Sequence, residues 1–363
     1  MRKLGLSDVR VTDNCFVYGV LPATEGLEDL PCMGLVAHMD TAPAYCGVDV
    51  KPQVIENYDG GDILLPATGE KLSPARFPHL AAMKGKTLIT TDGSTLLGAD
   101  DKAGVAEILS ALKAVIDQRL PHRKIAVAFT PDEEIGLGVH AFDVQGFGAE
   151  YAYTVDGGAP GDLNYENFNA CEATVAFRGV SVHPGGAKGM MVNACLLAME
   201  FNALLPGAET PRLTEGREGF FHLEGMQGDP VEARLVYIVR DHDAGSFERR
   251  KRQLRHIEKT LNERWGAGSV TLAIREQYRN MKEKLEPCFY VVENARRAMR
   301  EAGFEPMETA IRGGTDGAQL SYMGLPCPNL CTGGHGCHGP YEHIAVEDME
   351  ACVRMLVSLI TLR

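Results

Sequence analysis

The sequence has no run of eighteen apolar residues and no apolar signal-peptide core after Met1. A bilayer-spanning helix needs about 20 consecutive apolar residues, so we expect neither a membrane span nor secretion. Basic charge is also scarce, because 36 Lys and Arg stand against 49 Asp and Glu, giving a formal charge of −13. The one dense basic stretch, residues 248–256, has the periodicity of an amphipathic helix with a solvated face. Phosphate would be repelled, and we therefore expect no nucleic-acid partner.

A disulfide framework is lacking too, although the chain has 10 cysteines. They are spread singly through apolar segments, as at Cys171, Cys195, Cys288 and Cys352, which is typical of buried free thiols in a reducing compartment. We therefore expect a cytoplasmic protein. The 363 residues, 45% apolar and 23% charged, suffice for two domains and leave the oligomeric state open.

Short apolar strands alternate with helices in the first part of the chain. Residues 33–40, 124–130 and 152–158 form apolar runs, and residues 104–117 have the apolar spacing of an amphipathic helix. Buried runs separated by helices predict an α/β fold with a mostly parallel sheet that helices cover on both faces. Ligands of such sheets gather at the carboxyl ends of the strands.

The middle of the chain has a different order of elements. Residues 167–278 are predicted to form strand, helix, strand, strand, helix and strand in succession. This βαββαβ order is that of a ferredoxin-like unit. We therefore predict a ferredoxin-like lid domain at 167–278, inserted into an α/β domain that residues 1–166 and 279–363 form together.

Polar residues with metal-ligand chemistry follow three of the predicted strands. His38 and Asp40 end the first run, Glu133 and Glu134 follow the second, and Asp156 follows the third. Because side chains two apart on a strand face the same way, Asp40 could hold the far nitrogen of a metal-binding His38. Each motif is weak alone, since acidic turn residues and strand-end histidines are common. Their shared position at strand ends is what favours a site.

Two further segments add ligand-type residues. Asp100 and Asp101 stand at the entry to the 104–117 helix, where one aspartate would serve as an N-cap and the other would remain unexplained. His335, His338 and His343 lie within nine residues, among glycines that let the backbone approach a ligand. This loop is therefore a candidate for metal binding.

A structural zinc knuckle is the alternative for this loop. It would use Cys327, Cys331 and Cys337 with His335 or His338, but the usual Cys-x2-Cys unit is missing. A donor set of imidazole and carboxylate from five segments suits zinc, cobalt or manganese instead, and five donors exceed the needs of one tetrahedral ion. Two ions about 3.5–4 Å apart, bridged by a carboxylate, fit this number.

These segments resemble the zinc-dependent aminopeptidase and deacylase superfamily (M20-type metallopeptidases). The motifs follow in order as AHMDTAP, TLITTDGSTLLGADDKAGVAEI, AFTPDEEIGLG, AYTVDGG, SVHPGGAKGMMVNA, YIVRD, IRGGTDGAQLSYMGLPCPNL and CHGPYEH. IENYDGGDI and EGREGFFHL resemble its tripeptide aminopeptidases in particular. The resemblance covers almost the whole chain. It implies a dinuclear zinc enzyme that releases the N-terminal residue from small peptides with a free N-terminus.

The resemblance also implies the roles of individual residues. It gives five metal ligands, with a pair for each zinc ion and a bridge between them: His38 with Asp156, Glu134 with His338, and Asp100 as the bridge. Asp40 would orient His38, and Glu133 would be the general acid and base. The family's bridging aspartate precedes a cis peptide bond, so we expect one between Asp100 and Asp101.

Three residues would contact the substrate. By resemblance, His183 from the inserted domain would steady the tetrahedral oxyanion. Arg240 and Arg312 would hold the backbone or C-terminal carboxylate of the peptide through their planar guanidinium groups. His335 stands where the family is expected to have an aromatic residue, so it could compete with His338 for zinc.

Two alternatives remain open. A related dipeptidase or amino-acid deacylase would share every ligand and differ only in the substrate pocket. The family also carries a helical segment before the strand that begins near Val9, so we expect that an N-terminal helical segment is missing. A truncated metal-binding protein without activity is therefore the second alternative.

Overall fold

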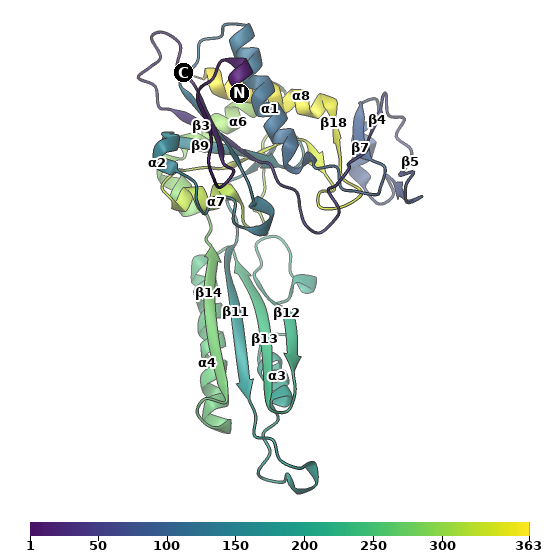
Figure 1. Cartoon of the computed structure of the whole chain (residues 1–363), viewed down its shortest axis with the longest axis vertical. Coiled ribbons are helices and arrows are strands. Elements are labelled where there is room, and N and C mark those ends of the chain that lie inside the picture. The colour runs from purple at the N-terminus through teal and green to yellow at the C-terminus, as the bar shows by residue number, and fades with distance from the viewer. Residues whose placement is uncertain (363) are drawn as a thin grey trace. The chain divides into compact units, whose positions relative to one another are not determined.

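The computed structural model describes residues 1–362, which form two compact units. The larger unit contains Met1–Tyr165, Met281–Thr309 and the chain from Thr315 on, and the smaller unit contains Glu166–Asn280 and Ala310–Gly314. The segment expected to be inserted, 167–278, therefore lies in the smaller unit. Residues 310–314, which we expected in the α/β domain, are also part of the smaller unit. Figure 1 follows the chain through both units.

A mixed eight-stranded sheet forms the centre of the larger unit, in the order β1-β2-β8-β3-β9-β16-β10-β15. The four central strands, β8, β3, β9 and β16, are parallel. On one side β2 pairs antiparallel with β8, and on the other β10 pairs antiparallel with β16 and parallel with β15. The strand bounds are β1 Ser7–Val11, β2 Val17–Leu21, β3 Met33–His38, β8 Ile125–Thr130, β9 Tyr151–Gly157, β10 Asp162–Asn164, β15 Met307–Glu308 and β16 Asn329–Cys331.

Helices cover both faces of this sheet, which explains why every residue of β3 and β8 is buried. On one face, Leu35 and Val127 pack against α1, α6 and α8; on the other, Val36 and Ala128 pack near α2 and α7. The α/β prediction is confirmed. The helix bounds are α1 Ala99–Asp117, α2 Val144–Phe147, α5 Lys282–Leu285, α6 Tyr290–Ala302, α7 Asp316–Tyr322 and α8 Val346–Thr361.

A second, smaller sheet belongs to the same unit and was not predicted from the sequence. It has the order β17-β18-β7-β4 and lies beside α8 in Figure 1, with the hairpin β5-β6 near it. The bounds are β4 Pro52–Ile55, β5 Ile63–Leu64, β6 Lys71–Leu72, β7 Leu88–Thr91, β17 Gly334–His335 and β18 His343–Ala345, with a 3-10 turn, η2, at Pro78–Met83. Tyr58, Leu80 and Ala345 share its core.

The smaller unit is a four-stranded antiparallel sheet with two helices, in the order β12-β13-β11-β14. Along the chain the elements follow the predicted βαββαβ order. They are β11 Asn169–Arg178, α3 Ala194–Ala203, β12 Phe220–Gly228, β13 Glu232–Asp241, α4 Ala244–Trp265 and β14 Val270–Tyr278. Phe177, Phe201 and Leu254 belong to the hydrophobic core that joins both helices to the sheet.

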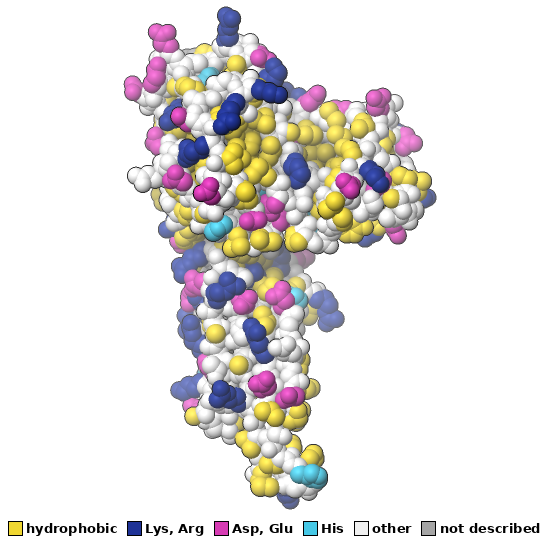
Figure 2. Space-filling model, viewed as in Figure 1, with side chains coloured by type: hydrophobic (Ala, Val, Ile, Leu, Met, Phe, Trp, Pro, Cys, Tyr) yellow, Lys and Arg dark blue, Asp and Glu magenta, His cyan; other side chains and the backbone are white. Residues whose placement is uncertain are grey.

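Among residues 1–362, no helix is both long enough and apolar enough to cross a bilayer. The 10 cysteines are free thiols, but Cys15, Cys46 and Cys337 are exposed rather than buried. Hydrophobic side chains gather on one face of the larger unit in Figure 2, over α1 and α8. Val346 and Met349 line a groove there.

Candidate metal centre

Three neighbouring parallel strands bring the first ligand-type residues together. His38 is the last residue of β3, and its register partner on β8 is Thr130. Glu133 and Glu134 follow β8 in a 3-10 turn, η3 (Glu133–Ile135), and Asp156 lies near the carboxyl end of β9. Because β8, β3 and β9 are adjacent and parallel, their carboxyl ends meet at one edge of the sheet.

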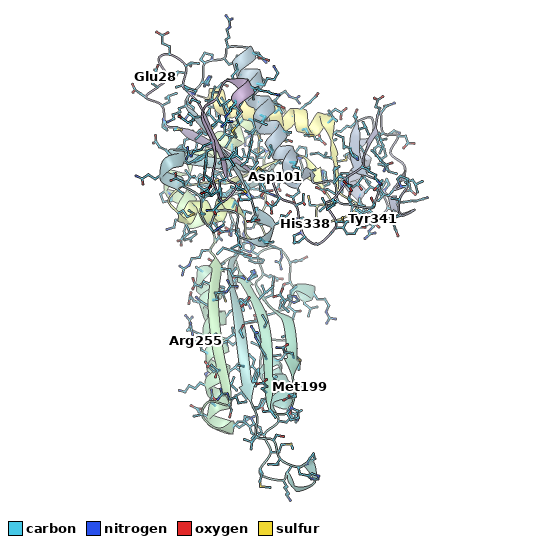
Figure 3. All side chains as sticks on the ribbon, in the orientation of Figure 1. Glu28, Asp101, Met199, Arg255, His338 and Tyr341 are labelled. Carbon is cyan, nitrogen blue, oxygen red and sulfur yellow. The ribbon has the colours of Figure 1, made fainter. Side chains whose placement is uncertain are left out.

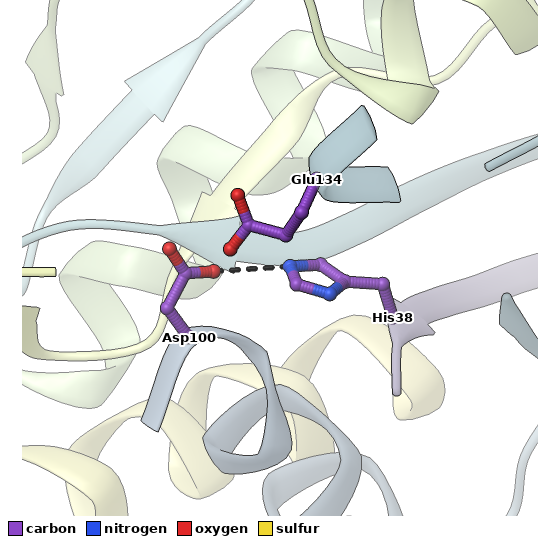
Figure 4. Close-up of side chains that lie close together, drawn as sticks. All are labelled: His38, Asp100 and Glu134. Atoms are coloured by element: carbon purple, nitrogen blue, oxygen red, sulfur yellow. Dashed lines mark hydrogen bonds and ion pairs between the residues drawn. The ribbon is translucent and has the colours of Figure 1, made fainter. Parts of the chain in front are cut away.

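Asp100 lies between two imidazoles. Its Oδ1 atom is 3.0 Å from Nε2 of His38, a contact drawn as a dashed line in Figure 4. Its Oδ2 atom is 3.0 Å from Nε2 of His338. His38 Nε2 is also 3.5 Å from Asp156 Oδ1, and His338 Nε2 is 3.1 Å from Glu134 Oε2. The five residues expected to be metal ligands therefore form one contiguous network.

The N-terminal turn of α1 positions Asp100. The peptide bond between Asp100 and Asp101 is cis, as expected. The N-cap interpretation is wrong, because the oxygens of Asp100 face two imidazoles and the Asp101 carboxylate accepts the N–H of His38 rather than one from the helix. Glu342 takes this role from outside the helix: its carboxylate accepts hydrogen bonds from the N–H groups of Leu97, Gly98 and Asp100 at 2.7, 2.7 and 2.9 Å.

Asp101 contacts a backbone group rather than an imidazole. Its Oδ2 atom accepts the backbone N–H of His38 at 3.0 Å, and the side chain is buried. Burial raises the pKa of this carboxyl well above its ordinary value. Asp101 therefore joins α1 to the end of β3.

Asp40 connects the histidine to the glutamate pair. Its two oxygens accept the N–H groups of Glu133 and Glu134, each at 3.1 Å. The same carboxylate lies 3.3 Å from Nδ1 of His38. Asp40 therefore fixes the start of η3 and orients the imidazole at once.

Glu133 lies beside His38 and Asp156, where one ligand atom from each of the three residues falls within 4.8 Å of the other two. Burial, with the charges of Asp156 and Asp316, raises the pKa of Glu133 to about 9.

The sequence analysis assigned no role to Asp316. It accepts a hydrogen bond from Thr130 Oγ1 at 2.8 Å, and burial raises its pKa to about 7. Its only signal was its place inside a family motif.

The carboxylates of this network favour positive charge beside them, as a protonated imidazole or a bound cation. Burial opposes an imidazolium at His38, but the nearby carboxylates of Asp100, Asp156 and Asp40 outweigh burial and raise the His38 pKa well above its ordinary value. Hydrogen bonds to Asp100 and Glu134 raise the pKa of His338 to about 10. Glu134 Oε1 is buried without a hydrogen-bond partner. Within residues 1–362 the ion pairs of these carboxylates are all to imidazole, so the donor set fits divalent cations.

The other two histidines of the loop do not join this network. His335 and His343 pack with His79 instead, so only His338 of the three faces the carboxylates. The two groups of metal-ligand type found among residues 1–362 contain no cysteine, which argues against the zinc knuckle. The loop therefore contributes one histidine to the candidate metal centre, His338, and not three.

Two of the expected substrate-binding residues lie in β13 and in the loop after β11, both in the smaller unit. His183 is exposed at the start of a 3-10 turn, η4 (Pro184–Gly186), where its Nδ1 accepts the N–H of Gly185 at 3.1 Å. Arg240 is 9% exposed and donates to the backbone oxygens of Cys171 and Val239 at 3.2 and 3.1 Å. Its guanidinium also lies 5.2 Å from the ring centroid of Tyr278.

Arg312 belongs to the short segment 310–314 of the smaller unit. Its Nη1 atom donates to the backbone oxygens of Gly216 and Glu218 at 2.7 and 3.1 Å. Its Nη2 atom lies 3.1 Å from Thr214 Oγ1, and the guanidinium stacks 5.0 Å from the Phe168 ring centroid. In this structure Arg312 therefore organises the loop that precedes β12.

Comparisons with known proteins give the family. The sequence model of peptidase family M20/M25/M40 matches residues 91–362. Peptidase T of Geobacillus sp. strain WCH70 is 52% identical over 364 residues, which cover 100% of this chain and 88% of the relative. Among solved structures, the aminopeptidase PepT of Bacillus cereus has a TM-score of 0.79 at 24% identity, covering 99% of this chain and 89% of that one. A Staphylococcus aureus tripeptidase has a TM-score of 0.78 at 23% identity, with coverage of 99% and 89%. The chain therefore belongs to peptidase family M20/M25/M40 and is an enzyme of the metallopeptidase class.

Proposed function

We propose that this peptidase is a dinuclear zinc aminopeptidase that releases the N-terminal residue from tripeptides. One observation carries the proposal: the two oxygens of Asp100 each lie 3.0 Å from a different imidazole, His38 on one side and His338 on the other. A carboxylate placed in this way suits a bridge between two cations. The tripeptide specificity rests on the similarity to peptidase T and to the staphylococcal tripeptidase.

Each ion would have its own pair of ligands. His38 and Asp156 would hold one ion, Glu134 and His338 the other, and Asp100 would contact both. Imidazole nitrogen and carboxylate oxygen suit zinc, with cobalt or manganese as substitutes. When bound, two such ions lower the pKa of a shared water and polarise the scissile carbonyl.

Glu133 would move the proton. Its carboxylate stands beside His38 and Asp156 but makes no ion pair to either histidine, which leaves it free for acid–base work. It would accept the proton of the attacking water and return it to the leaving amine. Asp40 would hold the His38 imidazole and the η3 turn in place during this transfer.

The substrate would be recognised by charge at both ends. The carboxylates of the centre would attract the free α-amino group, which agrees with the formal charge of −13. We propose that His183 steadies the oxyanion and that Arg240 and Arg312 contact the peptide backbone or its C-terminal carboxylate. In the structure both guanidinium groups already bind backbone oxygens of the smaller unit, so such contacts would need these bonds to be shared or exchanged. The 10 free thiols suit a cytoplasmic enzyme.

We expect zinc binding to release at least about two protons per chain at pH 7, one from each histidine ligand. Without metal, the carboxylates around His38 and His338 raise the pKa of both imidazoles, that of His338 to about 10, which favours the protonated rings at pH 7. Zinc requires the neutral rings, so both protons must leave. The release should diminish as the pH rises toward 10, where His338 is already partly neutral. Calorimetry of zinc binding in buffers of different ionisation enthalpy measures the number of protons released. No release at pH 7 would contradict the assignment of His38 and His338 as zinc ligands.

The substrate class is tested by three matched peptides. We expect the zinc-loaded enzyme to release the first residue of a tripeptide, and to cleave its N-acetylated form at least about 100-fold less efficiently, because the acetyl group removes the charged amine. The corresponding dipeptide should also be a poorer substrate. Comparison of kcat/KM by chromatography of the products decides. Preferred cleavage of the acetylated form would favour an amino-acid deacylase, and preferred cleavage of the dipeptide would favour a dipeptidase.

A further inference from the structure

Three imidazoles pack together in the larger unit, outside the metal centre. The ring centroids of His79 and His335 are 4.2 Å apart with planes 12° from parallel. Those of His79 and His343 are 5.0 Å apart with planes 4° from parallel, and those of His335 and His343 are 5.5 Å apart. His79 comes from η2, whereas the other two come from β17 and β18. We call these residues the histidine cluster.

Hydrogen bonds fix the protons within the histidine cluster. His343 Nδ1 lies 2.7 Å from the backbone oxygen of Tyr341, and because a carbonyl only accepts, this nitrogen carries a hydrogen. The neutral ring then has an unprotonated Nε2. This atom lies 2.9 Å from Nε2 of His79, which must donate. Both nitrogens of His343 are therefore occupied, and neither is available to a metal ion.

The histidine cluster lies at the base of the loop that presents a metal ligand. His335 and His343 are register partners across the β17–β18 hairpin. The hairpin loop carries His338, labelled in Figure 3, and ends at Glu342. Glu342 in turn holds the N–H of Asp100. The positions of both His338 and Asp100 thus depend on the position of this hairpin. His79 lies outside the hairpin and forms a hydrogen bond to His343 within it.

Burial favours the neutral rings of the histidine cluster. Burial, then the neighbouring rings and Lys86, lowers the pKa of His335 to about 3, and burial lowers that of His343 to about 4. Burial also lowers the pKa of His79. Lys86 is paired with Asp348. The other charged groups nearby act on aromatic neighbours, with Arg76 over Tyr341 and Glu70 bonded to the Tyr341 hydroxyl. Within residues 1–362, no carboxylate accepts a hydrogen bond from these three rings.

We propose that His79 is a positioning residue for the metal ligand His338. Its hydrogen bond to His343 and its packing on His335 hold the base of the hairpin, so that the loop keeps His338 Nε2 within reach of Asp100 and Glu134. This inference rests on the proposed role of His338 as a ligand. His79 itself touches neither metal nor substrate.

The decisive measurement is zinc affinity, by competition with a chelator, in variants of His79. We expect His79→Phe, which keeps a ring but loses the donor, to bind one of two zinc ions about 10–100-fold more weakly, because outer residues that orient a ligand have effects of this size. Where zinc does not fill the weakened site, the kcat should fall with that affinity. At saturating zinc, the KM should be that of the parent. His79→Gln, which keeps an N–H donor, should recover most of the affinity. The matched control is His256→Phe, an exposed histidine of α4, which should bind zinc as the parent does.

Each outcome separates this inference from the proposed function. Unchanged zinc affinity in His79→Phe would overturn it, and so would equal losses in His79→Phe and His79→Gln, which would indicate packing alone. If His338→Ala keeps both ions, the metal assignment itself fails; if it loses one ion and His79→Phe loses none, only the role of His79 fails.

A measurement on the parent protein covers the case in which His79→Phe does not fold. In ¹⁵N NMR of the rings, His343 should show a protonated Nδ1 and an unprotonated Nε2. His79 should show a protonated Nε2, and none of these signals should acquire the shift of a zinc-bound nitrogen when two equivalents of zinc are added. His338 should acquire it. Zinc-bound signals from His79 or His343, or the opposite tautomer of His343, would overturn the inference.

Discussion

We expect the Glu133→Gln variant to lose hydrolysis, with kcat lower by about 10²–10⁴-fold, while it still binds two zinc ions. The amide keeps the size of the side chain and removes the group that accepts a proton. Burial and the charges of Asp156 and Asp316 raise the pKa of Glu133 above that of an exposed carboxyl, so its carboxylate takes up a proton more readily, and the amide cannot do so. Parallel assays of tripeptide cleavage and of zinc content test both halves of this expectation.

The matched comparison for this variant is Glu134→Gln. Glu134 Oε2 lies 3.1 Å from His338 Nε2, and its other oxygen is buried without a partner, so its loss should remove an ion. Two ions in Glu133→Gln and fewer in Glu134→Gln would support the division of roles. The reverse result would mean that the neighbouring glutamates exchange roles, with Glu133 the ligand beside His38 and Asp156.

The strand-end part of the centre could be predicted because it follows from local patterns. His38, Glu133, Glu134 and Asp156 each come at the end of an apolar run, and parallel strands place such ends along one edge. The structure puts β8, β3 and β9 side by side in this way. Asp100 and His338 have no such pattern, because one opens a helix and the other lies in an irregular loop. Only the family resemblance assigned their roles.

What sequence reasoning missed are partners far apart in the chain. Glu342 caps the start of α1 across 242 residues, and His79 meets His343 across 264. Neither shows a spacing that a periodic pattern could reveal. Residues 52–91 were likewise left without strands, because β4 and β7 are four residues each. They pair with one another, and β7 also pairs with β18, in a hairpin near the other end of the chain. The interpretation of Asp100 or Asp101 as an N-cap failed for the same reason, since the true cap is distant.

The second large effect is expected from Asp100→Asn, which should bind at most one zinc ion and show no measurable cleavage of tripeptides. Its two carboxylate oxygens face His38 and His338, whereas an amide offers one oxygen and directs an NH₂ group at the other side. Because changes in outer residues already weaken metal binding by about 10–100-fold, removal of a shared ligand should cost more than about 100-fold. Chelator competition and metal analysis measure the loss.

The neighbouring Asp101→Asn variant is the control for charge and folding at this turn. Asp101 is buried, its pKa is raised well above the ordinary value by burial, and its oxygen accepts the backbone N–H of His38, which an amide oxygen can also accept. This variant should therefore bind two ions. If Asp100→Asn bound both ions as tightly as Asp101→Asn, Asp100 would not be a bridging ligand. Each ion would then be held by a separate set of ligands. A one-ion Asp100→Asn protein with an unfolding temperature like that of Asp101→Asn would instead locate the loss at the shared carboxylate rather than in the fold.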